Sequence, residues 1–176
     1  MRKLISWLAS FKKPAIEKRS KNRNNAGLSI KLSHEDEILF TKFCQFVWIQ
    51  GEPIPLIYDL KNEIYNSQDV TLPVLKHFEA LGLLMLEPRG YIKKRFGKHM
   101  RIFCAGRPTK IAFPHDGNNQ LDLGHVLLTE AGKELAISYG VLRNQAFYEY
   151  VIARWFQQGL ILSSIQLDIE KSPHAN

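Results

Sequence analysis

A helix that ends at a glycine and passes directly into an apolar strand is the feature that most narrowly limits the fold of this chain. Asp69 or Thr71 can cap this helix, and Pro73 is tolerated in its first turn. Gly82 adopts a left-handed conformation without strain and therefore ends the helix. The inward face consists of Val74, Leu75, Phe78 and Leu81. Residues 83–86 then form an apolar strand, which is the order of helix-turn-helix modules with a β-wing.

Two helices are expected before this one. Ser33 and Asp36 match a capping box that opens a helix running to about Gln50, with Gly51 at its end. Its apolar residues occupy most of the circumference, which predicts a largely buried helix. A second helix is expected over residues 55–65, because proline is favoured in a first turn. Its apolar stripe consists of Leu56, Leu60 and Ile64.

The region after residue 86 is expected to consist mainly of strands and two late helices. Residues 91–96 and 99–104 are predicted to form a hairpin turned at Gly97. The remaining expected elements are a strand over 109–113, a returning strand over 121–128, a helix from Thr129 to Ser138 ended by Gly140, a helix from Asn144 to Gln158 ended by Gly159, and an edge strand with Ile165, Leu167 and Ile169 on one face.

The predicted fold class is α+β, with a winged helix-turn-helix type core, a β-wing, an extra C-terminal helix and a basic N-terminal arm. The expected organisation is a basic arm over 1–31 with an amphipathic start and a flexible linker, a winged-helix-like domain over 32–140, a C-terminal helix and edge strand over 141–170 packed on that domain, and a disordered tail over 171–176.

Positive charge is concentrated in two short stretches. Seventeen of the 24 Lys and Arg residues lie in residues 1–31 and 89–110, which together contain one acidic residue, Glu17. The rest of the chain carries seven basic and 16 acidic residues. Such segregation indicates a solvated positive surface that faces an anionic ligand.

Residues 89–110 are the predicted nucleic-acid-binding wing. Side chains on a wing can reach phosphates beside a groove, and the interleaved Tyr91, Phe96 and Phe103 could stack on the bases of a single strand. An acidic protein partner, or a purely solvated face with core aromatics, would fit the same pattern. The eight basic residues are Arg89, Lys93, Lys94, Arg95, Lys98, Arg101, Arg107 and Lys110.

The helix before Gly82 predicts modest sequence specificity. Burial of its apolar face turns Lys76 outward, places His77 at the border and exposes Glu79, which would face phosphates unfavourably. Recognition helices usually present several donors to base edges, whereas here only Lys76 and His77 qualify. The wing and arm should therefore supply most of the affinity.

Catalytic and metal sites are not indicated. The chain has no Gly-x-Ser-x-Gly turn and no phosphate-binding glycine loop. The acidic residues 35–37 occupy the first turn of a predicted helix, where negative charge favours the helix dipole, and this is a sufficient explanation for the cluster. His115 and Asp116 are typical residues of a polar loop. His99 with Cys104 would supply only two of four metal ligands. We expect no enzymatic activity, metal or cofactor.

Location and further partners follow from the apolar segments. Cys44 and Cys104 lie sixty residues apart on apolar segments, which predicts buried thiols in a reducing compartment. No apolar run reaches the ~18 residues that span a bilayer, so we expect a cytoplasmic protein. Residues 1–13 could form an amphipathic helix that contacts a membrane surface weakly or docks on protein. The helix over 144–158 could bury its aromatic rows internally, bind a protein partner or form a homodimer.

Four segments carry a resemblance to a known family. They are Leu32-Ser33 with Glu37 and Phe40, FEALGLL from Phe78, HVLLTEAGKEL from His125, and FYEYVIARWFQQG from Phe147. Together they resemble the C-terminal winged-helix-like module of a family of uncharacterised bacterial proteins that share a domain of unknown function. The likeness covers about residues 28–160, and the family's longer N-terminal helical region has no counterpart here. The resemblance implies a fold and no catalytic residue.

Two functions therefore stay open at the level of sequence. The first is a nucleic-acid-binding winged-helix protein, acting as a regulator or accessory factor, that contacts mainly phosphates. The second is an interaction subunit without nucleic-acid binding, in a bacterial stress or phage-response system. The second context is implied only by the resemblance.

Overall fold

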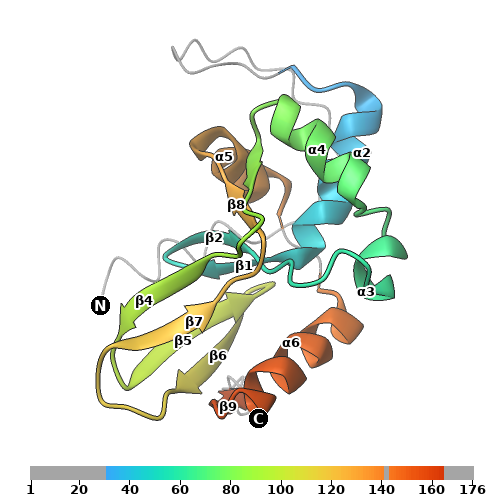
Figure 1. Cartoon of the computed structure of the whole chain (residues 1–176). Helices are drawn as coiled ribbons and strands as arrows, with labels where there is room; N and C mark the ends of the chain where they lie inside the picture. Colours follow the sequence, from blue (N-terminus) through green and yellow to red (C-terminus); the bar gives the residue numbers. More distant parts are fainter. Residues whose placement is uncertain (1–30, 141–142, 165–176) are drawn as a thin grey trace, which may run out of the picture.

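The computed structural model describes residues 31–140 and 143–164, which form a mixed α+β structure with antiparallel sheets (Figure 1). The helices are α2 (His34–Phe43), the 3-10 turn η2 (Cys44–Phe46), α3 (Glu63–Asn66), α4 (Leu72–Ala80), α5 (Glu130–Tyr139) and α6 (Gln145–Gln157). The strands are β1 (Val47–Gln50), β2 (Glu52–Pro55), β3 (Leu84–Leu86), β4 (Ile92–Phe96), β5 (His99–Cys104), β6 (Arg107–Ala112), β7 (Asn119–Asp122), β8 (Val126–Leu128) and β9 (Ile161–Ser164).

The strands pair in three sheets. The largest has the order β2-β1-β5-β6-β9, and β3-β8 and β4-β7 form two-stranded ribbons. Ala105 and Gly106 both have positive φ and join β5 to β6 in a two-residue turn, whose twist suits a tight hairpin.

The β4-β7 ribbon and α6 cover one face of the five-stranded sheet. Figure 1 shows the ribbon in front of β5 and β6, with α6 beside it. Met100, Ile102 and Cys104 alternate along β5 and are buried on this face. The Trp48 ring packs edge-on against Trp155 of α6 at a centroid distance of 5.4 Å. One part of the core therefore lies between the sheet and this second layer.

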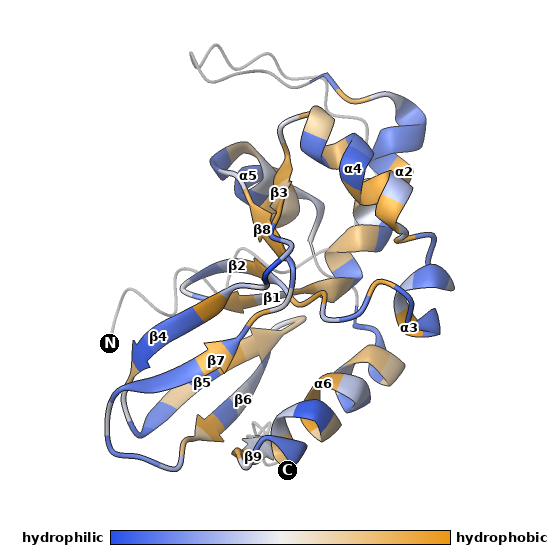
Figure 2. Cartoon of the chain, in the orientation of Figure 1, coloured by the Kyte–Doolittle hydropathy of each residue, from blue (hydrophilic) through white to orange (hydrophobic). Residues whose placement is uncertain are grey.

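The helical part of the chain is assembled around an aromatic cluster. Phe40 of α2 and Phe78 of α4 are fully buried, with ring centroids 5.4 Å apart. Thr71 precedes α4, and Gly82 has a φ of 75° immediately after it, so the predicted helix, its glycine stop and the strand that follows are confirmed. Figure 2 shows that β3 and β8 are hydrophobic, whereas β4 is mainly hydrophilic.

The first predicted helix is too long. It begins as expected with the capping box of Ser33 and Asp36, but α2 ends at Phe43. Residues 47–50 form β1, and Gly51, with a φ of 74°, turns the chain into β2. A run that is apolar on all sides fits a buried strand as well as a buried helix, so periodicity alone does not separate them.

The helix predicted over residues 55–65 is largely wrong. Only α3 is helical there, and Pro55 ends the edge strand β2. Leu56, Ile57 and Tyr58 continue as a buried segment outside any helix. Proline is tolerated at edge strands as well as in helix first turns, and the edge position prevails here.

The predicted basic hairpin is also wrong. Residues 92–96 and 99–104 are strands, but β4 pairs with β7, whereas β5 pairs with β1 and β6. The returning strand expected over 121–128 is divided into β7 and β8. The alternating apolar residues of β5 are buried when this strand lies within the large sheet. Strand β4 has no buried residue and folds over that sheet. The described part is richer in sheet than the expected winged helix.

The two late helices are confirmed. Thr129 caps α5, which ends at Gly140, and Asn144 caps α6, where Phe147, Val151 and Trp155 are buried. The observed edge strand β9 precedes the predicted one, since Ile165, Leu167 and Ile169 lie outside the described residues. The predicted arm before Lys31 and the tail over 171–176 also lie outside them.

The T-x-x-G pattern of α5 has a clear structural cause. The Thr129 hydroxyl donates to the carbonyl of Gly82 at 2.7 Å and accepts from the Gly132 amide at 3.1 Å. A Cβ atom on Gly132 would lie 1.9 Å from the Leu83 carbonyl oxygen. Glycine is therefore required for α5 to pack against the exit from α4.

The apolar segments form core rather than a membrane span. Within the described residues, no helix is long and apolar enough to cross a membrane. Cys44 and Cys104 are buried free thiols, as predicted, and burial raises the pKa of each to about 12. Both thiols are therefore neutral and poorly nucleophilic.

Candidate nucleic-acid interface

The eight basic residues of the predicted wing do not form one face. Those of β4 belong to the ribbon in front of the large sheet, whereas Arg101 and Lys110 lie on strands of that sheet. Arg101 alternates with the buried Met100 and Ile102, so its side chain points away from the ribbon. The structure thus divides the cations between two outer surfaces.

Arg101 and Lys110 are direct partners across β5 and β6. Side chains directly opposite each other in an antiparallel pair have Cβ atoms ~5 Å apart, and like charges at this position are destabilising. No carboxylate in the described part of the chain forms an ion pair with either of them. This pair is therefore a local concentration of positive charge without an ion-pair partner among the described residues.

Lys94 and Arg95 form a second cationic feature, on a β-bulge. The register of β4 against β7 shifts between Lys93 and Phe96, so two residues of β4 oppose one of β7. Arg95 has a φ of 68°, which is unfavourable for a residue with a Cβ atom. As a result both Lys94 and Arg95 are exposed, whereas a regular strand would direct one of them inward.

Lys93 and Lys98 are engaged within the protein. The Lys93 ammonium donates to the Gln50 side chain at 2.8 Å and lies 3.6 Å from Glu52. The Lys98 ammonium donates to the Pro114 carbonyl at 2.9 Å and lies 3.5 Å from Asp116. Lys93 is thereby removed from the outer surface, whereas the Asp116 side chain is 98% exposed and provides little neutralisation.

Arg89 and Arg107 are exposed beside turns. Arg89 precedes Gly90, whose amide closes a turn on the Glu87 carbonyl. Arg107 follows the Ala105-Gly106 turn at the start of β6. Both lie outside the Arg101–Lys110 pair and the β4 bulge, so they are single exposed cations apart from these two clusters.

Helix α4 has less to offer a base edge than its sequence indicates. Lys76 is exposed as predicted, but His77 lies with its Nε2 2.7 Å from the Asp36 carboxylate. Hydrogen bonds from Ser33, followed by the contact with His77, lower the pKa of Asp36. The Glu79 carboxylate accepts from the Leu86 amide at 2.8 Å. His77 and Glu79 therefore hold the helices and β3 together.

His99 and Cys104 point to opposite faces of β5, so they cannot share a metal ion. His99 is exposed on the same face as Arg101, opposite Ala112. It adds a polar ring to the cationic face, a position that strand alternation could have indicated once β5 was recognised.

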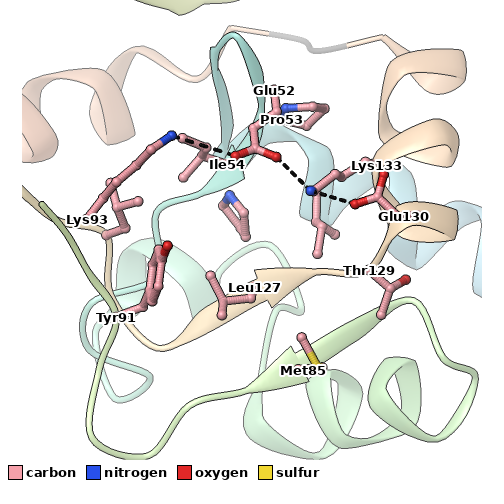
Figure 3. Close-up of a pocket in the computed structure, with 13 residues that line it drawn as sticks. Glu52, Pro53, Ile54, Met85, Tyr91, Lys93, Leu127, Thr129, Glu130 and Lys133 are labelled. Atoms are coloured by element: carbon pink, nitrogen blue, oxygen red, sulfur yellow. Dashed lines mark hydrogen bonds and ion pairs between the residues drawn. The ribbon is translucent and has the colours of Figure 1, made fainter. Parts of the chain in front are cut away.

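A cleft that the sequence did not reveal lies beside β2, β8 and α5 (Figure 3). Its upper side carries a chain of ion pairs in which Glu52 lies 3.6 Å from Lys93 and 2.6 Å from Lys133. Lys133 also contacts Glu130 at 2.8 Å. These interactions raise the pKa of Lys133, with the Glu130 hydrogen bond as the largest cause, and lower that of Glu52. The four residues come from three segments that are distant in the sequence, so no local motif predicts this cluster.

Helix α6 buries one of its two aromatic rows in the core. Phe147, Val151 and Trp155 are buried, whereas Phe156 is 72% exposed. Ile161 of β9 is also 72% exposed. The protein or homodimer contact predicted for this helix therefore has an apolar surface available and stays a prediction. The membrane contact predicted for residues 1–13 lies outside the described residues.

The chain matches no family model, and no similar protein was found among curated proteins or solved structures. The resemblance to the bacterial family consequently stays a prediction.

Proposed function

We propose that the protein binds nucleic acid, mainly through phosphates, with the outer face of β5 and β6 and the bulge of β4. The observation that carries this proposal is the direct opposition of Arg101 and Lys110, neither of which forms an ion pair with a carboxylate of the described residues. Two cations that face each other across neighbouring strands of a sheet lower the free energy of a nearby phosphate. Lys94 and Arg95 provide a second cationic cluster on the β4-β7 ribbon.

The proposed contacts are largely independent of sequence. Backbone contacts position a protein on nucleic acid, whereas sequence is distinguished through base edges. In α4 only Lys76 remains as a free donor among the predicted pair, because His77 is bound to Asp36. For the same reason we propose that α4, β3 and β8 form a winged-helix arrangement that serves as a scaffold. The protein would then act as an accessory factor or regulator of modest sequence specificity.

Fluorescence anisotropy with labelled random-sequence oligonucleotides, duplex and single-stranded, at several salt concentrations tests the proposal. Engagement of about four phosphates predicts a slope of roughly −3.6 for the logarithm of the duplex association constant against that of salt. In the double variant R101Q/K110Q the slope should fall in magnitude by about 1.8. A slope near zero for the unmodified protein would exclude phosphate binding.

The matched control is Lys61→Gln, which removes an exposed cation that lies between β2 and α3, outside β4, β5 and β6. It should leave both affinity and slope unchanged. If K61Q weakens binding as much as R101Q/K110Q, the effect reflects net charge alone and the assigned site is wrong.

Docking of a protein on α6 and β9 is a second candidate, favoured by the exposure of Phe156 and Ile161. Large exposed apolar side chains that lie close together are typical of interaction surfaces. Light scattering after size exclusion would test the homodimer form. A dimeric protein that becomes monomeric in Phe156→Ser supports it, and a monomer at high concentration excludes self-association through this surface.

A further inference from the structure

The cleft beside β2, β8 and α5 has the character of a small-molecule site. Its volume is about 430 Å³, within the ~300–1,000 Å³ of ligand pockets. Ile54, Met85 and Leu127 contribute apolar surface to its lining, and Met85 is 51% exposed. Figure 3 shows the ion pairs of Glu52 on the side of the cleft opposite Met85. A ligand here would meet an apolar floor and one charged wall.

The charged wall holds a cation with a replaceable partner. The Lys133 side chain is only 22% exposed and contacts both Glu52 and Glu130, whereas the Glu130 side chain is 87% exposed. An exposed ion pair contributes only ~0–1 kcal/mol, so displacing Glu130 costs little. Glu52 also contacts Lys93 and would keep the two lysines in place.

We propose that this cleft binds a small amphiphilic monocarboxylate, with its apolar body on Ile54, Met85 and Leu127 and its carboxylate on Lys133 in place of Glu130. Charge complementarity sets the class. Without Glu130 the wall carries Lys93, Lys133 and Glu52, a net charge of about +1 that one carboxylate neutralises. A neutral ligand could not replace Glu130 as the partner of Lys133, and a second anionic group would exceed the net charge of the wall.

The backbone of β2 argues for a small molecule rather than an extended peptide. β2 is an edge strand of the large sheet, where a peptide could add as a further strand. However, Pro53 and Pro55 lack amide hydrogens, so two of the four residues of β2 can donate no hydrogen bond. Side-chain contacts with a compact ligand are compatible with this edge.

Calorimetric titration of the full chain with octanoate and with octan-1-ol tests the proposal, because the two probes share an apolar chain and differ in charge. Octanoate should bind with one-to-one stoichiometry, and octan-1-ol about tenfold or more weakly, as expected for losing a hydrogen bond to a charged group. Equal affinities, or no octanoate binding at millimolar concentration, would overturn the proposal.

Two variants locate the carboxylate. Glu130→Gln removes the competitor of the ligand and should raise octanoate affinity about threefold, while Lys133→Met should lower it about tenfold. Glu130 is exposed, so E130Q tests the site even if K133M proves unstable. Lys61→Met is the control and should change nothing.

The outcomes separate this site from the nucleic-acid surface. Neither E130Q nor K133M touches Arg101 or Lys110, so oligonucleotide binding by both variants should equal that of the unmodified protein. An unchanged or reduced octanoate affinity in E130Q would refute the displacement of Glu130. Binding of an apolar peptide in the cleft, with octanoate excluded, would assign it to a protein partner instead.

Discussion

Several single residues hold two elements of the fold together. Gly132 lies where any larger residue would collide with the Leu83 carbonyl, and the Thr129 hydroxyl joins the start of α5 to the end of α4. Asp36 closes the capping box of α2 and also contacts His77 of α4. Each of these residues joins two elements, so we expect its replacement to lower stability more than replacement of an ordinary surface residue.

Replacing Gly132 by alanine should lower the free energy of unfolding by about 2 to 3 kcal/mol, because overpacking against backbone forces α5 to move. Urea denaturation measures this change. Gly97→Ala is the control, since its added Cβ would meet no atom within 4 Å. A Gly132→Ala variant as stable as the Gly97→Ala variant would contradict the close packing.

The pH dependence of stability should reveal Asp36. Its pKa is lowered in the folded state, so its contribution is fully present above the ordinary value of 3.8 and is lost as pH falls through the lowered value. The unmodified protein should therefore exceed Asp36→Asn in stability near neutral pH, and the difference should shrink below pH 3.8. Denaturation curves across this range measure it, and a difference independent of pH would show that the charge is irrelevant.

The pairing of the strands determines which basic residues lie close together. The β4 bulge exposes Lys94 and Arg95 together, and the pairing of β5 with β6 brings Arg101 opposite Lys110. A sheet selected only for stability would avoid two like charges at directly opposed positions. The cost in stability at this position is what binding of an anion would relieve.

Lys110→Glu should consequently stabilise the protein while weakening nucleic-acid binding. An opposite charge facing Arg101 contributes ~0.2–1 kcal/mol, so the midpoint of denaturation should rise. Anisotropy with a random duplex should show lower affinity in the same variant. Lys61→Glu provides the comparison, and stabilisation of similar size there would mean that the cross-strand pair has no special role.

In the molecule as a whole, the basic residues of the predicted wing lie mainly on strands, whereas α4 contributes one exposed lysine. The outer face of β5 carries Arg101, the ribbon in front carries the bulge, and α4 contributes Lys76 on another element. Cations spread over several elements suit a flexible or repetitive polyanion better than a defined series of base edges.

Affinity should accordingly vary little with nucleic-acid sequence. Among random duplexes of equal length, association constants should differ by less than about tenfold, because each lost base contact normally costs ~1–3 kcal/mol and few such contacts are available. Selection of bound sequences from a random pool would check this. Strong enrichment of one motif would indicate direct readout that Lys76 alone does not account for.

Local patterns in the chain were sufficient to predict the caps and ends of several elements. Thr129 and Asn144 cap α5 and α6, and Gly82 and Gly140 follow α4 and α5 with positive φ, as expected, because capping and positive φ depend on a few adjacent residues. The buried row of α6 followed equally from helical spacing.

Strand pairing and the two candidate sites depended on contacts between distant segments. The run that becomes β1 fits helix and strand alike, and only its pairing with β2 and β5 settles its structure. Likewise, β4 and β5 are adjacent in the chain but belong to different layers, and the cleft joins Glu52 to Lys133. Such contacts are chosen by the burial of the entire core, which no short window of residues contains.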